Sequence, residues 1–147
     1  MKTYSPEEGS MIVDGNIIDA WNTIKVARDE DGFAFEPSTS GGGTRTKNSN
    51  KAGKFTITTQ QTSESNAVLS DLAKSGDIFS CSFRDNSGND VHESEAGYVV
   101  KPADSEYGKE VGEREWMIQC EVLNMDPRGS QNKINIEGLR RTALLKK

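Results

Sequence analysis

The sequence lacks the features that mark membrane-spanning and exported chains. Only 33% of its 147 residues are hydrophobic, and no apolar run approaches the ~18 residues that a membrane-spanning helix needs. The opening stretch, MKTYSPEEGS, has no apolar segment of the kind found in a secretory signal. We therefore expect neither a membrane span nor a signal peptide.

Residues suited to catalysis and metal binding are also scarce. The one histidine, His92, follows a polar turn and is expected to be solvated. A catalytic triad would also need an activated serine or cysteine, and no motif in the sequence marks one. The two cysteines, Cys81 and Cys120, form no Cys/His cluster with metal-ligand spacing. Both fall on the apolar side of a predicted strand, so buried thiols are the simplest interpretation, while a disulfide would require proximity. We expect no enzyme activity, no metal and no cofactor.

Two polar segments resemble ligand-binding loops but lack the required spacing. The glycines at 41–43 are not followed by the second glycine and the Gly-Lys-Ser/Thr of a phosphate-binding loop. The segment Asp85–Asp90 has its glycine at the fourth place and lacks the glutamate that closes a calcium loop. A hairpin turn is the better prediction for this second segment.

The charge balance is acidic, with 23 Asp and Glu against 18 Lys and Arg and a formal net charge of −5. This balance argues against a surface that grips phosphates tightly. It is compatible with a wall that nucleic acid passes, because an acidic surface repels DNA and prevents sticking. The low hydrophobic content predicts a thin core, to which partner subunits would add stability.

The strongest local signal is a change of period within Lys54–Ala73. Phe55 and Ile57 alternate with polar residues, which predicts a strand with one buried face. Farther along, Leu69 and Leu72 lie on one stripe of a helix, predicted over about 64–75. We expect all four side chains in the core.

The ends of this helix also carry signals. Ser63 or Ser65 can cap its first turn, because a short side-chain oxygen accepts from the free backbone donors there. Gly76 is a plausible stop, since glycine readily adopts the left-handed conformation that ends many helices.

Alternating patterns predict strands through most of the remaining chain. Asp14-Gly15 between apolar runs predicts a hairpin turn, and Trp116 and Ile118 are expected in the core. The predicted fold class is mainly β: an antiparallel sandwich or barrel with one short flanking helix. The other predicted strands are Met11–Val13, Asn16–Trp21, Thr23–Arg28, Ile78–Arg84, Val91–Glu95, Tyr98–Lys101 and Glu113–Met125.

The segment Glu36–Lys54 differs from the rest because it contains no aromatic and no large aliphatic residue. It cannot bury itself, so it is predicted to be a long mobile loop or an extended arm that orders against a neighbour. Its basic residues, Arg45, Lys47, Lys51 and Lys54, are the expected contacts of that arm.

The predicted domain runs from 1 to 127, and residues 128–147 form a basic C-terminal extension. Three interpretations of the extension stay open: docking on a neighbour, fraying in solvent, or contact with nucleic acid or membrane.

Several stretches together resemble one family of virion proteins. They are GKFTITTQQTSESNAVLSDLA at 53–73, KPADSEYGKEVGEREWMIQC at 101–120, the opening MKTYSPEEGSMIVDG, and the pattern R-x-E-D-x-F at 28–33. In combination they are similar to the tail tube proteins of contractile-tailed phages over about 1–125. The chain departs from that pattern by an insertion at Glu36–Gly43 and by the tail beyond Pro127.

The resemblance implies a structural protein of the virion tail. Six copies would close a ring by joining their sheets, and rings would stack into a tube that delivers the genome. The loop between early strands commonly reaches the adjacent ring in this family, which here is the arm at 36–54. The implied partners are the chain itself, sheath, tail terminator and baseplate proteins, with DNA passing unbound. Assembly would take place in the host cytoplasm.

Two other functions remain as alternatives. A phage-like bacteriocin or a type VI secretion-type machine would use the same kind of tube without passing DNA, and the neighbouring genes would separate the two. A monomeric β-sandwich that binds or adheres would instead sediment as a monomer at high concentration. An enzyme is disfavoured because the sequence has no catalytic constellation.

Overall fold

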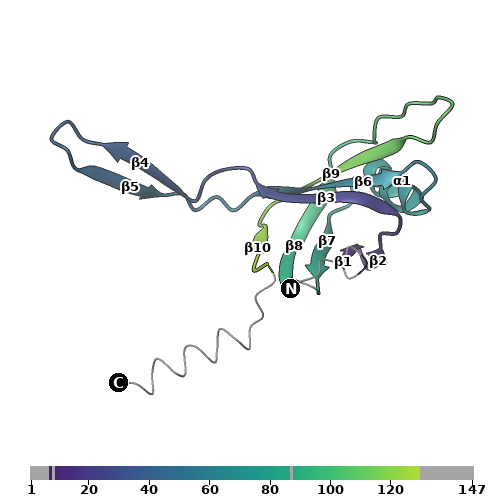
Figure 1. The fold of residues 1–147 in the computed structure, drawn as a ribbon, viewed down its shortest axis with the longest axis horizontal. Coiled ribbons are helices and arrows are strands. Elements are labelled where there is room, and N and C mark those ends of the chain that lie inside the picture. The colour runs from purple at the N-terminus through teal and green to yellow at the C-terminus, as the bar shows by residue number, and fades with distance from the viewer. Residues whose placement is uncertain (1–6, 8, 87, 130–147) are drawn as a thin grey trace, which may run out of the picture.

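A computed structural model describes residues 7, 9–86 and 88–129 of the chain. One sheet runs in the order β2-β1-β7-β8-β9-β6-β3, with β10 beside β8, and β4 and β5 form a separate hairpin (Figure 1). The prediction of a mainly antiparallel β fold with one helix is confirmed. The elements are β1 Gly9–Val13, β2 Asn16–Ile17, β3 Trp21–Arg28, β4 Phe33–Pro37, β5 Gly43–Lys47, β6 Gly53–Gln60, α1 Ser65–Ser75, β7 Phe79–Asp85, β8 Asp90–Val99, β9 Glu113–Cys120 and β10 Asn124–Asp126.

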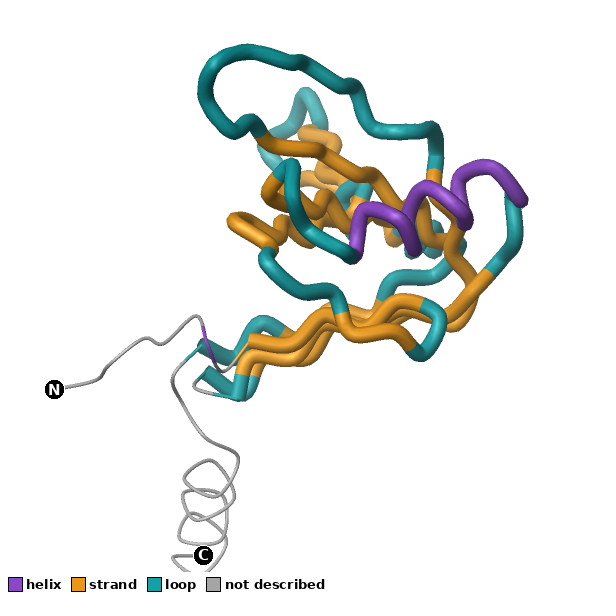
Figure 2. The backbone as a smooth tube through the Cα atoms, turned by 90° about the vertical axis from the view of Figure 1, so that its right-hand side faces the viewer, coloured by secondary structure: helices purple, strands orange, loops and turns teal. Residues whose placement is uncertain are grey.

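The sheet folds into two layers because β8 belongs to both of them (Figure 2). Strand β8 pairs with β7 from Asp85↔Asp90 to Phe79↔Gly97, and its last residues pair with β9 from Gly97↔Cys120 onward, so Gly97 contacts both neighbours. A register shift on β7 between Phe79 and Cys81 marks the corner, as bulges do where strands change layers. Two separate strands, Val91–Glu95 and Tyr98–Lys101, were predicted here. The structure has one bent strand, because the break in alternation near Gly97 is a bulge within the strand and not a gap between two strands.

The folded sheet is an open sandwich and not a closed barrel. Its end strands, β2 and β3, do not pair with each other in the described part of the chain. Strand β2 is short, and a positive φ of 54° at Ala20 separates it from β3. The expected Asp14-Gly15 turn is confirmed, with φ values of 51° and 78° that join β1 to β2.

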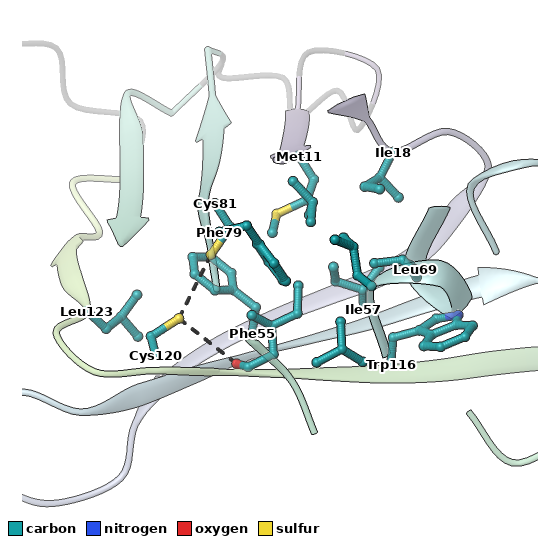
Figure 3. Close-up of a cluster of buried hydrophobic side chains, with 14 residues drawn as sticks. Met11, Ile18, Phe55, Ile57, Leu69, Phe79, Cys81, Trp116, Cys120 and Leu123 are labelled. Carbon is teal, nitrogen blue, oxygen red and sulfur yellow. Dashed lines mark hydrogen bonds between the residues drawn. The ribbon is translucent and has the colours of Figure 1, made fainter. Parts of the chain in front are cut away.

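The core lies between the two layers and α1, where the side chains from β6 and β9 meet those of the helix (Figure 3). The strand predicted over Glu113–Met125 places Val122 on the same inward side as Trp116 and Ile118, but Val122 is exposed and Leu123 is buried instead. Strand β9 ends at Cys120, so the following turn breaks the alternation that the sequence suggested. All six expected core residues are less than a tenth exposed, namely Phe55, Ile57, Leu69, Leu72, Trp116 and Ile118.

Helix α1 ends as predicted at Gly76, whose φ of 70° turns its N–H back to the Leu72 carbonyl. Its start agrees with the prediction in part, because Ser63 accepts from a backbone N–H of the first turn although it is not the N-cap residue. The N-cap residue is Glu64, and its side chain caps nothing. Ser63 Oγ accepts from the Ser65 N–H at 3.3 Å but also donates to the Asp19 carbonyl at 2.7 Å. The serines thus anchor the helix start to the segment between β2 and β3.

The one helix in the described part of the chain, α1, has 11 residues, and no helix there is long and apolar enough to cross a bilayer. Of the predicted extension at 128–147, residues 130–147 lie outside the described residues, as do residues 1–6.

Candidate assembly interface

The segment predicted to be a long mobile loop or an extended arm, Glu36–Lys54, contains most of a β-hairpin. Strands β4 and β5 pair from Phe33↔Lys47 to Pro37↔Gly43, and they project from one end of the body as an arm (Figure 1). The tip closes through Ser38 and Gly41, which has a φ of 95°. Of the two forms predicted for this segment, a mobile loop or an extended arm, the structure has the arm, because ladder hydrogen bonds and cross-strand pairs hold the hairpin without a buried face.

The arm has one aromatic and cationic face. Residues that pair across the hairpin lie on the same face, so Phe33 and Phe35 share theirs with Lys47 and Arg45. The Arg45 guanidinium lies 4.4 Å from the centre of the Phe33 ring, within cation–π range. The Phe35 ring covers Gly43, where any Cβ would overlap it. We call this set of Phe33, Phe35, Arg45 and Lys47 the aromatic face.

The aromatic face is largely exposed in the described part of the chain. Phe33 is 52% exposed and Phe35 is 69% exposed, although phenylalanine is among the residues most often buried. The opposite face of the hairpin carries Ala34, Glu36, Thr44 and Thr46, so the apolar area is concentrated on one side. Such a one-sided apolar area typically marks a contact surface.

Side chains at its base hold the arm in place. The Glu30 carboxylate accepts hydrogen bonds from Asn48 Nδ2 at 2.8 Å and Asn50 Nδ2 at 3.0 Å. The Asn48 N–H also donates to the Gly32 carbonyl at 2.8 Å. The bonds from Asn48 and Asn50 lower the pKa of Glu30. The hairpin therefore leaves the body at a defined base.

The return segment after β5 is fastened to the body as well. The Leu123 N–H donates to the Lys51 carbonyl at 2.8 Å, and the Leu123 carbonyl accepts from the Arg28 guanidinium. Lys54 lies in β6, 3.8 Å from an Asp29 oxygen. Of the basic residues expected on the arm, Arg45 and Lys47 are on the hairpin, Lys51 is in the connection, and Lys54 is in the body.

An acidic cavity lies where the 100–112 connection crosses the outer side of β6 and β9. It measures about 620 Å³. Lys101 is paired with Asp104 at 3.5 Å, and Asn22 donates to Glu113 at 2.8 Å. The lining residues are Thr58, Lys101, Asp104, Ser105, Glu106, Glu113, Glu115 and Met117. Four carboxylates against one lysine give this cavity a negative potential.

The sheet also has free edges. Strand β3 pairs with β6 on one side and with no other described strand, and β2 pairs only with β1. A free edge presents unpaired backbone donors and acceptors and invites another strand. The eight residues of β3 make the longer of these two edges.

The environment of His92 contradicts the expectation of a solvated side chain. His92 is 6% exposed, and its Nδ1 has no hydrogen-bond partner in the described part of the chain. Burial lowers the pKa of His92, although the charges of Asp90 and Asp126 oppose that shift. His92 and Ser94 alternate with exposed residues along β8, which is a sequence signal for an inward-facing side chain. The polar turn predicted just before His92 obscured that signal.

The two cysteines are buried free thiols, as expected. Their sulfur atoms lie 3.8 Å apart although β8 separates β7 from β9. Gly97 pairs with Cys120, and its missing side chain leaves the space that the Cys120 sulfur approaches. The hydrogen bond to Cys120 and burial both raise the pKa of the Cys81 thiol, which therefore stays protonated at neutral pH.

Residues 9–86 and 88–129 contain no group of three His, Cys, Asp or Glu side chains that could hold a metal ion.

Comparison with known proteins identifies a phage relative. The chain is 30% identical over 95 residues to "Structural protein ORF10" of Pseudomonas phage KPP10. The match covers 60% of this chain and 55% of the relative, so the chain spans about half of that protein. No protein-family model matches.

Solved structures share the fold at low sequence identity. The cap of the anti-feeding prophage, described as its tube-terminating cap, has a TM-score of 0.56 at 4% identity and covers 86% of this chain and 93% of its own. The sheath/tube terminator of an extracellular contractile injection system has a TM-score of 0.57 at 8% identity, covering 86% and 98%. The sheath–tube complex of that system gives 0.57 at 8%, covering 85% and 92%.

The chain therefore shares its fold with a tube-terminating cap, a sheath/tube terminator and a sheath–tube complex. The relative that it matches over 95 residues is named as a phage structural protein. At this level the prediction of a tail-related structural protein agrees with the comparisons.

Proposed function

We propose that this chain is a tube subunit of a phage tail, in which rings of six copies stack into the conduit for the genome. The observation that carries the proposal is the arm, whose Phe33 and Phe35 are largely exposed in the described part of the chain. The relative's identity as a phage structural protein supports a place in the virion. Host cytoplasm is the proposed site of assembly.

Ring closure would use the free edges of the sheet. Strand β3 of one copy would continue the sheet of its neighbour at β2 or β1, which covers both edges. Such heterologous contacts close into a ring when the rotation between copies permits it. The arm would then act along the tube axis, where Arg45, Lys47 and the connecting Lys51 contact the next ring.

The proposed partners follow from this position. Copies of the chain contact each other, sheath surrounds the tube, and terminator and baseplate proteins bind its two ends. The formal charge of −5 suits a lumen through which DNA passes without specific binding. In a bacteriocin or type VI secretion-type machine the same tube would carry no DNA.

A terminator is the second candidate, because two of the solved structures with this fold are named as a tube-terminating cap and a sheath/tube terminator. A terminator would form single rings and add to the end of a tube, but would not polymerise alone. The two functions therefore differ in whether the purified chain elongates.

Negative-stain microscopy of the purified protein tests the proposal. We expect the intact chain to form tubes, and a variant with Phe33–Lys47 replaced by two glycines to form rings without tubes. The Asn48–Gly32 hydrogen bond brings the ends of this deletion together, so the body should fold. Tubes from the deletion variant would refute the role of the arm, and single rings from the intact chain would favour a terminator.

A further inference from the structure

We propose that the aromatic face of the arm docks in the acidic cavity of the next copy of the chain. This inference rests on the proposed function and names both surfaces of the axial contact. The arm contributes Phe33, Phe35, Arg45 and Lys47, and the receiving surface is the cavity between the 100–112 connection and the strands β6 and β9.

Charge complementarity selects this partner surface. The aromatic face carries two cations and no carboxylate, since Glu36 lies on the opposite side of the hairpin. The cavity carries four carboxylates, and Lys101 is already paired with Asp104. The side chains of Glu115 and Glu106 form no hydrogen bond or ion pair within the described part of the chain and remain available to Arg45 and Lys47. Opposite potentials across an interface fix its register and suppress wrong partners.

The cavity also offers surface for the phenylalanine rings. Met117 and Thr58 are half-buried and form part of its lining on the strand side. Methionine makes favourable contacts with aromatic rings. Tyr107 and Val111, on the crossing connection, are 77% and 70% exposed. The aromatic rings of Phe33 and Phe35 would gain apolar neighbours there. Arg45 and Lys47 would meet the carboxylates of the cavity.

The positions of the two surfaces exclude docking within one molecule and favour head-to-tail contacts between successive copies. The arm projects from one end of the body, and the 100–112 connection lies at the opposite end (Figure 1). The arm of one copy can therefore reach the cavity only on another copy. A head-to-tail contact of this kind leaves a free arm and a free cavity after each addition, so it propagates along an axis.

Charge reversal tests the pairing. We expect Arg45→Glu or Glu115→Lys alone to raise the protein concentration needed for tube growth about tenfold or more, the effect of losing a close charge pair. Combining both substitutions should restore most of the assembly. Thr46→Glu, on the opposite face of the arm, and Glu93→Lys, an exposed carboxylate on β8, are matched controls that should assemble normally. Equal losses in the controls, or no rescue in the double variant, would overturn the pairing.

A photo-crosslinker placed at Phe35 locates the docking site directly. Benzoylphenylalanine keeps the aromatic ring, and mass spectrometry of the full chain identifies the peptide that it labels. We expect labelling between copies within 101–117. Tubes with labelling elsewhere would overturn this docking site but leave the tube intact as a proposal. Labelling within 101–117 in particles that never elongate would keep the docking and contradict the tube.

Discussion

Truncation of Trp116 should destabilise the subunit through lost packing more than through its lost hydrogen bond. The indole is 4% exposed and packs between β9 and α1. Its Nε1–H donates to Asn66 Oδ1 at 3.1 Å, and that oxygen also accepts from the Thr59 hydroxyl. Trp116 thus links the sheet to the first turn of the helix, and two substitutions can separate its contributions.

The expected loss of unfolding free energy depends on the packing and the hydrogen bond that each substitution removes. Trp116→Ala removes a buried ring and opens a cavity, which costs about 3–5 kcal/mol of unfolding free energy. Trp116→Phe keeps most of the apolar volume and loses one hydrogen bond, worth about 0.5–1.5 kcal/mol. Asn66 Oδ1 keeps its bond from Thr59, so no buried acceptor is orphaned. We expect Trp116→Phe to cost less than half as much as Trp116→Ala.

Urea denaturation followed by circular dichroism measures both values. The measurement belongs in the variant that lacks Phe33–Lys47, because assembly would otherwise add to the apparent stability. Tyr98→Ala, at an exposed position on β8, is the matched control and should change stability little. A loss under about 1 kcal/mol for Trp116→Ala would place the ring at the surface and refute this account of the core.

Three further predictions concern His92, the thiols and the base of the arm. Because burial lowers the pKa of His92, the unfolded chain binds its proton more readily, and stability should fall as pH drops below about 6.5. Urea titrations of His92→Gln should lack that component; an unchanged pH dependence would contradict it. Cys81 and Cys120 are buried, so a thiol reagent should modify them slowly in folded protein and fully in denaturant, and rapid labelling of the folded chain would contradict their burial. Glu30→Gln removes the charged acceptor of two asparagine side chains, so hydrogen exchange should speed up in the 48–52 segment, whereas Glu36→Gln on the arm should leave it unchanged.

The local sequence was sufficient to predict those elements whose apolar residues repeat with the period of a strand or a helix. The alternation of Phe55 and Ile57 and the helical stripe of Leu69 and Leu72 each follow from backbone geometry alone. The stop at Gly76 likewise depends on the conformational freedom of one residue. The structure contains these features where the sequence placed them.

The candidate interface could be predicted only in part. The basic character of Arg45 and Lys47 was visible in the sequence, but their alignment with Phe33 and Phe35 on one face depends on the register of the hairpin. The segment Glu36–Lys54 has no large apolar residue, so its sequence predicted a mobile loop or an extended arm without specifying paired strands. Cross-strand pairing, which local periodicity does not encode, decided its structure.

The sequence by itself determined the fold class, the helix and most of the core, because burial repeats with the period of each element. The tertiary structure alone decided that His92 is buried and that the sulfur atoms of Cys81 and Cys120, 39 positions apart, lie within 3.8 Å. It also decided that the arm and the 100–112 connection, which lines the acidic cavity, lie at opposite ends of the body. These features depend on where the sheet bends and on which strands become neighbours, and such long-range pairing is settled only when the whole chain folds.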